Sequence, residues 1–135
     1  LKYELVFFYN VFGPGQIING KMSAVIGTFE KLYKKRKPLT IVKPGTQKRD
    51  FTHIDDIVNG CYLAMIKGRQ NEYMLCTNKS YSIIQIAKMF NTKIKFIKMR
   101  PGDRFGSTTI NNNAEKILGF KAIKDIRTYI RNLIR

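Results

Sequence analysis

Apolar side chains recur at two different spacings along the chain, and the change in spacing predicts its elements. Residues 4–12 are almost all apolar or aromatic, which is typical of a buried strand. Between residues 22 and 35 the apolar positions instead fall three or four apart, as on one face of a helix, and Pro38 ends that helix. The two patterns then alternate, with strands at 39–42, 73–76 and 94–97 and helices at 53–66, 82–90, 112–119 and 123–134. This alternation indicates an α/β fold.

Two of these helices carry recognisable ends. Thr52 is the predicted N-cap of the helix at 53–66, because a hydroxyl there can accept from the first backbone N–H groups. Asn112, with Glu115 three residues on, predicts a capping pair at the start of the next-to-last helix, and Gly119 predicts its end.

Length and composition indicate one globular domain at most. The chain has 135 residues, of which 44% are hydrophobic, a share too high for a disordered tail. No stretch approaches the roughly 18 uninterrupted apolar residues that a transmembrane helix needs. The start lacks both an initiator Met and a signal peptide, so we expect the chain to open within a longer protein or to have been trimmed. Cys61 and Cys76 have no metal-binding spacing, and we expect reduced core thiols in a cytoplasmic protein.

The net charge of +16 raises the possibility of a nucleic-acid partner. Lys, Ile and Asn are all abundant, which is typical of a drift toward A/T-rich codons rather than of a demand for positive charge. The basic residues are scattered, and the one dense run, residues 34–37, follows a predicted helix, where cations suit the helix dipole. We therefore expect no dedicated nucleic-acid surface, and keep a basic nucleic-acid-binding module as the alternative of another class.

One segment resembles a nucleoside-triphosphate-binding P-loop and another a metal site, and both fail on their details. Residues 15–21 have the glycine and lysine spacing of a P-loop, but Met22 stands where that motif needs a hydroxyl to bind Mg²⁺. His53, Asp55 and Asp56 are too close in sequence to converge from one helix onto a metal, and acids in a first helical turn are explained by the helix dipole. We therefore expect no metal site.

Tyr33 and Lys37 match the tyrosine–lysine spacing of short-chain dehydrogenases. That chemistry needs both side chains on one helix face, and Lys37 directly precedes Pro38, which expels it from helical geometry. Packing is the better account of Tyr33, and we expect no catalytic residue in the chain.

Four short segments combine into a more specific pattern: residues 8–16, 39–51, 100–103 and 113–120. Asn10 lies at the carboxyl end of a strand, where ligands bind in open α/β sheets. Arg49 follows a glycine turn and Arg100 lies in an Arg-Pro-Gly-Asp turn. A guanidinium held in such a turn can form paired hydrogen bonds with a diphosphate.

In this order and spacing, the segments resemble the carboxyl-terminal portion of NAD-dependent nucleotide-sugar epimerases and dehydratases, the extended short-chain dehydrogenase/reductase family. Members like UDP-glucose 4-epimerase are the nearest match. The resemblance implies the substrate-binding part of an extended Rossmann-type dehydrogenase/reductase, an α/β fold with a small mixed sheet and several helices. Residues 1–135 would form a single substrate-binding fragment, and residues 1–20 would contribute a late strand and turn of the Rossmann domain.

The resemblance also implies roles for individual residues. Asn10 would bind the sugar nucleotide near its pyrophosphate, and Tyr9 would lie beside the nicotinamide of NAD. The remaining substrate-binding residues would be Arg49 and Arg100 on the diphosphate, Asp103 on the ribose, Thr40 and Val42 at the base, and Met22 against the ligand. The expectation that the two guanidiniums converge on one diphosphate is the one on which the others depend.

The family's glycine-rich dinucleotide fingerprint and its catalytic Tyr and Lys are absent from the chain. We therefore expect NAD to be bound mainly by an amino-terminal part outside the chain, and the chain alone to lack activity. The resemblance implies oxidation and reduction at the sugar C4 in the full enzyme, with a UDP-sugar as substrate, no membrane association and a homodimeric assembly. A dehydratase or decarboxylase of the same family is the alternative. The strand at 4–12 is too apolar for a free edge, so we expect it to pair or aggregate unless covered.

Overall fold

The computed structural model describes residues 1–20, 22–98 and 112–135 of the chain. Helices and strands alternate, as the apolar pattern predicts, and the α/β class is confirmed. In chain order the elements are β1 (Leu5–Phe8), α1 (Val25–Lys34), β2 (Leu39–Val42), β3 (Lys48–Asp50), α2 (Ile54–Lys67), β4 (Glu72–Leu75), β5 (Ser80–Ser82), α3 (Ile83–Met89), β6 (Ile94–Ile97), α4 (Asn113–Leu118) and α5 (Ile126–Leu133). None of the helices in these ranges is long and apolar enough to cross a membrane.

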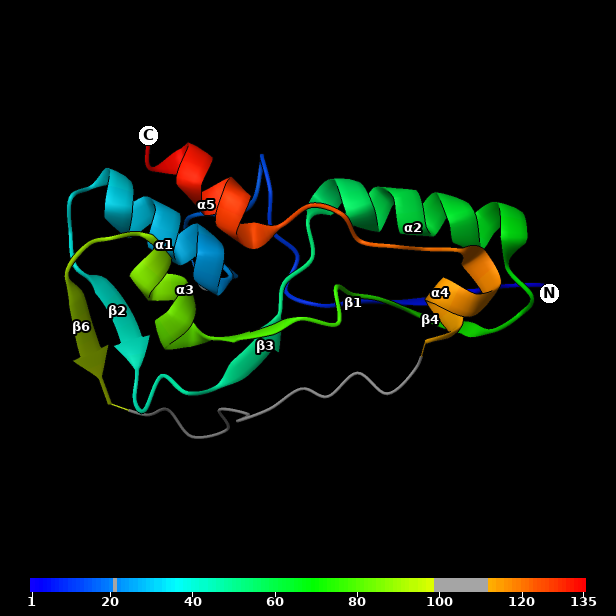
Figure 1. Cartoon of the computed structure of the whole chain (residues 1–135), viewed down its shortest axis with the longest axis horizontal. Coiled ribbons are helices and arrows are strands. Elements are labelled where there is room, and N and C mark those ends of the chain that lie inside the picture. The colour runs from blue at the N-terminus through cyan, green and yellow to red at the C-terminus, as the bar shows by residue number, and fades with distance from the viewer. Residues whose placement is uncertain (21, 99–111) are drawn as a thin grey trace.

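The elements form two lobes, which lie side by side in Figure 1. In the first lobe, α1, α3 and α5 pack around the parallel pair β2–β6, and the buried aromatic rings of Phe12, Phe29 and Phe90 belong to its core. In the second lobe, α2 and α4 pack on the parallel pair β1–β4, with Tyr73 and Leu75 fully buried. The antiparallel pair β3–β5 lies between the lobes (Figure 1). The predicted small mixed sheet is therefore divided into three two-stranded pieces among the described residues.

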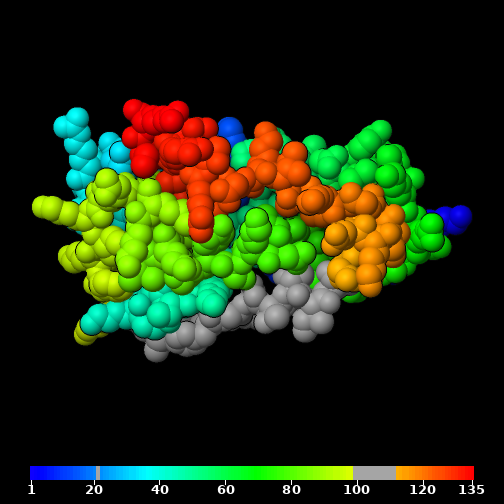
Figure 2. Space-filling view, in the orientation of Figure 1, coloured from blue at the N-terminus to red at the C-terminus, as the bar shows by residue number. Residues whose placement is uncertain are grey.

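The segment after α4 links the lobes. Figure 2 shows this part of the chain, coloured orange to red, running along the surface from α4 to α5. The buried carboxylate of Asp56, on α2, accepts from the backbone N–H groups of Ile123 and Lys124, at 3.2 and 2.9 Å. Hydrogen bonds from two N–H groups to one buried charge are strong, so Asp56 holds this connection against α2.

Helix α2 lies very close to β4 because it carries glycine at the point of contact. A Cβ added at Gly60 would lie 2.6 Å from Cδ1 and 2.7 Å from Cδ2 of Leu75. Since Leu75 is fully buried, its side chain has little room to yield. Gly60 is therefore required for this approach of helix to strand.

The predicted helix ends are partly confirmed. Gly119 ends α4 in the left-handed conformation, with φ 68°, as predicted. The predicted capping pair at Asn112 is wrong: Asn112 has φ −106° and ψ 19°, outside the extended geometry of an N-cap, and its side chain makes no capping bond. Thr52 is also not the N-cap of α2. That place is taken by His53, whose Nδ1 accepts from the Asp55 N–H at 3.1 Å.

The prediction of a buried strand over residues 4–12 is corrected by the structure. Strand β1 ends at Phe8, and Asn10, with φ 36°, turns the chain away. Phe7 and Phe8 are 41% and 52% exposed, and because successive side chains of a strand point to opposite faces, neither face of β1 is fully covered at its end. The apolar run therefore divides into a short, half-covered strand and a turn.

The side chain of Glu4 connects the start of β1 to the turn before β4 through hydrogen bonds. Its carboxylate accepts from the backbone N–H groups of Gln70 (2.9 Å) and Asn71 (3.0 Å). These bonds, Asn71 first and then Gln70, hold the pKa of Glu4 below its ordinary value.

We expect the stability that Glu4 contributes to depend on pH. Because its pKa is lower in the folded chain than in the unfolded chain, the contribution is fully present above the unfolded value and is lost as the pH falls through the folded one. Glu4→Gln should therefore flatten the acid limb of the curve of unfolding free energy against pH, measured by urea denaturation. An acid limb identical in the variant and the parent chain would contradict this assignment.

Candidate substrate-binding site

A hydrogen bond joins Asn10 to β3, the strand that carries Arg49. The side-chain amide of Asn10 donates to the backbone carbonyl of Asp50 at 2.7 Å. Arg49 directly precedes Asp50 on β3, is half-buried, and donates from Nη1 to the carbonyl of Lys48 at 2.8 Å. The amide of Asn10 is thus bound to the backbone of the strand that carries Arg49.

Thr40 and Val42 lie on β2, where they alternate with the buried Leu39 and Ile41. Both are half-buried, so their side chains share the outer face of the strand. The amide of Gln47 donates to the carbonyl of Val42 at 3.3 Å and so ties the end of β2 to the segment that enters β3. The predicted base-lining residues are therefore connected through Gln47 to the strand that carries Arg49.

Met22 and Tyr9 are less closely joined to this group. Met22 is 82% exposed and borders a hollow of about 330 Å³ formed by the turn at 13–17 and by Ile54. The lining of that hollow includes neither Asn10 nor Arg49. Tyr9 is half-buried and follows the end of β1 directly.

Arg100 and Asp103 lie outside the described residues. The expected convergence of Arg49 and Arg100 on one diphosphate therefore stays a prediction.

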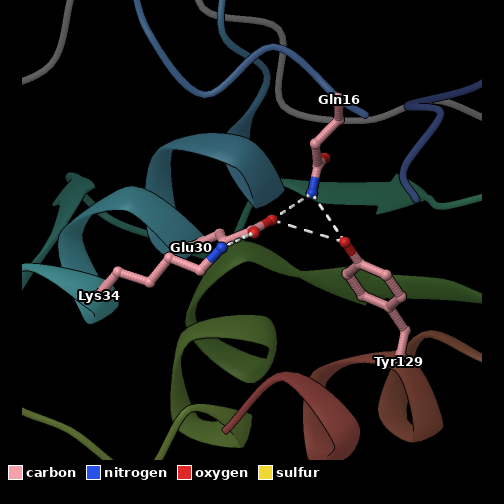
Figure 3. Close-up of polar contacts among 4 residues, drawn as sticks. All are labelled: Gln16, Glu30, Lys34 and Tyr129. Carbon is pink, nitrogen blue, oxygen red and sulfur yellow. Dashed lines mark hydrogen bonds and ion pairs between the residues drawn. The ribbon is translucent and has the colours of Figure 1, made fainter. Parts of the chain in front are cut away.

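A polar network that the sequence analysis missed holds the turn at 13–17 in place (Figure 3). The amide of Gln16 donates to Oε2 of Glu30 (2.8 Å), on α1, and to the hydroxyl of Tyr129 (3.2 Å), on α5. The other oxygen of Glu30 forms an ion pair with Lys34 at 2.6 Å. Burial, followed by the charge of Glu30, raises the pKa of Tyr129 above its ordinary value. The network thus fixes one wall of the hollow to two helices.

His53, Asp55 and Asp56 all make contacts within the fold. His53 caps α2, and Asp55 pairs with Lys124 at 3.0 Å, a hydrogen bond that lowers the pKa of Asp55. Asp56 points to the backbone of Ile123 and Lys124. The three side chains thus cap α2 and hold residues 123 and 124 against it.

Strands and helices in this order, with parallel strand pairs covered by helices, define the class of α/β folds. The sequence model of the NAD dependent epimerase/dehydratase family matches residues 1–87, which include both Asn10 and Arg49. The chain belongs to this family.

Relatives in that family fit the same picture. A UDP-glucuronate 4-epimerase of Thermodesulfobacterium geofontis is 40% identical over 60 residues, which cover 44% of this chain and 17% of the relative. UDP-glucuronic acid decarboxylase 6 of Arabidopsis thaliana is 21% identical over 127 residues, 90% of this chain and 36% of the relative. The crystal structure of UDP-glucose 4-epimerase from Thermotoga maritima, with UDP-glucose, superposes with a TM-score of 0.91 at 24% identity.

That superposition covers 99% of this chain and 45% of the Thermotoga chain, and it confirms the fold. The chain spans about a third or less of the length of the curated relatives named above and less than half of the solved structure.

Proposed function

We propose that this chain is the nucleotide-sugar-binding portion of an NAD-dependent UDP-sugar 4-epimerase, with residues 1–135 as one substrate-binding unit. The proposal includes a cytoplasmic, homodimeric full enzyme, in which residues 1–20 complete the Rossmann domain. The observation that carries it is the hydrogen bond of 2.7 Å from Asn10 to Asp50, which brings the predicted amide ligand next to the strand of Arg49.

In this proposal the residues of the chain bind and orient the substrate. Arg49 and Asn10 take the diphosphate, Thr40 and Val42 line the base pocket, and Met22 touches the ligand from the turn side. Arg100 and Asp103 keep their proposed roles on the diphosphate and the ribose. Anchoring the nucleotide in this way leaves the sugar free to turn, which inversion at C4 requires.

Tyr9 is the one described residue that we propose to lie beside NAD. Tyr9, half-buried at the end of β1, would lie beside the nicotinamide, while the sequence holds no glycine-rich dinucleotide fingerprint. NAD would accept and return the hydride at C4 when bound. We assign no step of that chemistry to this chain and expect it to show no epimerase activity alone.

A second candidate within the family is a UDP-sugar decarboxylase or dehydratase. The match to the Arabidopsis decarboxylase extends over 90% of this chain, at 21% identity. The two candidates share the anchoring of the nucleotide and differ in the chemistry at the sugar, so the binding experiment below tests what they have in common.

We expect the chain to bind UDP about 10–100-fold more tightly than uridine, measured by isothermal titration calorimetry. A charge-assisted hydrogen bond contributes about 1.5–3 kcal/mol, and about 1.4 kcal/mol corresponds to a tenfold change in affinity. Arg49→Gln should remove most of the difference between the two ligands, because it removes the charge and keeps a polar side chain.

Duplex DNA, titrated at rising salt, serves as the comparison ligand. Affinity for DNA falls steeply with salt, whereas a diphosphate in a formed site loses less. Equal affinity for UDP and uridine, or tighter binding of DNA than of UDP at moderate salt, would overturn the proposal in favour of a basic binding module.

A further inference from the structure

We propose that Asp50 is a positioning residue of the substrate site: its buried carboxylate sets the backbone of β3 so that Asn10 and Arg49 face a diphosphate together. The proposal deepens the proposed function and rests on it. Asp50 itself would not touch the ligand.

The carboxylate of Asp50 is buried, and both of its oxygens accept hydrogen bonds from the protein. Asp50 is 2% exposed, and burying a carboxylate is costly unless hydrogen bonds compensate. Its Oδ1 accepts from the backbone N–H of Thr77 (3.0 Å) and from the hydroxyls of Thr77 (2.8 Å) and Thr52 (3.4 Å). Its Oδ2 accepts from the backbone N–H of Lys79 at 3.1 Å. The side chain thus clamps the loop between β4 and β5 onto β3.

The backbone of the same residue connects the clamp to the site. The carbonyl of Asp50 accepts the amide of Asn10 at 2.7 Å, and the peptide bond on its other side joins it to Arg49. Because Asp50 is held both at its carboxylate and at its carbonyl, its backbone cannot rotate without breaking one set of bonds. Any rotation would move the Asp50 carbonyl that accepts from Asn10 and, at the same time, the Cα from which the Arg49 side chain extends. Binding groups give higher affinity when their conformational freedom is already lost before the ligand arrives.

Asp56 provides a matched control within the same chain. It is also a buried carboxylate, 4% exposed, and it also accepts two backbone N–H groups. Its bonds hold residues 123 and 124 against α2, and they involve none of the proposed substrate-binding residues. Removing its charge should therefore disturb the fold to a similar degree without altering the site.

The experiment compares Asp50→Asn and Asp56→Asn in the full chain, with UDP as the probe in calorimetric titration and urea denaturation for stability. In each variant one carboxylate oxygen becomes an NH₂ group that faces backbone donors, so both should lose stability. We expect Asp50→Asn to weaken UDP binding about tenfold or more, the loss of about one charge-assisted contact, and Asp56→Asn to change it less than about twofold.

A spectroscopic readout separates positioning from general destabilisation. The side-chain amide resonance of Asn10 should shift in Asp50→Asn and stay in place in Asp56→Asn, in ¹H–¹⁵N spectra recorded without ligand. If Asp50→Asn does not fold, Thr77→Val serves instead, since it removes one hydroxyl donor to Asp50 and leaves the charge in place.

The outcomes are distinguishable. If the parent chain fails to bind UDP, the proposed function fails, and an unmoved Asn10 resonance in the Asp50 or Thr77 variant would overturn the positioning role as well. If the parent chain binds UDP and the Asp50 variant binds equally well, or weakens no more than Asp56→Asn, this inference alone is wrong.

Discussion

Gly60→Val should lower the free energy of unfolding by about 2–3 kcal/mol, a large part of the stability of a domain of this size. The first added carbon would lie within 2.7 Å of both methyl groups of Leu75, and two further carbons follow it. The helix propensity of valine recovers only a few tenths of a kcal/mol relative to glycine. Urea denaturation followed by far-ultraviolet circular dichroism measures the change.

Two companion variants make this prediction specific to the contact between α2 and β4. Asn59→Val, on the exposed face one position earlier, should change stability by less than about 0.5 kcal/mol. Leu75→Ala alone should be costly, at about 2–5 kcal/mol for a buried leucine, yet should cost clearly less when combined with Gly60→Val. Additive effects of the two substitutions would show that α2 does not lie against Leu75.

The isolated chain should associate with itself through β1. Strand β1 pairs with β4 alone among the described residues, and Leu5, Phe7 and Phe8 are 41–52% exposed on it. Parallel sheets are normally covered on both faces, and an apolar edge strand is a ready template for another chain. Sedimentation velocity should therefore show a weight-average mass that rises with concentration.

Phe7→Lys should shift the chain toward the monomer, because a charge in the middle of an edge strand disfavours pairing. Thr128→Lys adds the same charge at an exposed position of α5, in the other lobe, and should leave the association unchanged. A parent chain that stays monomeric at high concentration, or an equal response of the two variants, would count against β1 as the contact.

The apolar pattern predicts the first and last residues of an element best where the local sequence marks both ends. Strands β2 and β6 begin and end where predicted, because each is a short, mainly apolar segment that charged residues or proline bound on both sides. Strands β3 and β5 are absent from the prediction. They are polar and three residues long, and they exist through pairing with each other across about thirty residues, which no local pattern contains.

The errors at helix ends also have physical causes. Thr52 is completely buried, and its hydroxyl is directed to Asp50 and to the carbonyl of Leu75, each at 3.4 Å, so it is not available as a cap. His53 takes over, and its ring Nδ1 accepts the backbone N–H of Asp55.

The sequence alone suggests members for the candidate site, but it does not reveal the residues that support them. Asn10 and Arg49 stand out in the sequence because both lie next to turns. Asp50 looks like half of an ordinary surface ion pair until its burial is known. The contact between Gln16 and Tyr129 joins residues 113 positions apart, beyond the reach of any periodicity.

The route of the chain through its two lobes bears on how it reaches the folded state. The core of the first lobe joins Phe12 to Ile130, and that of the second joins Val6 to Phe120, so neither core is assembled from neighbouring segments. Closing such long loops costs entropy before the contacts repay it. Neither hydrophobic core can form completely until nearly the whole chain is present. Truncated chains that end before α4 would leave both cores exposed to water.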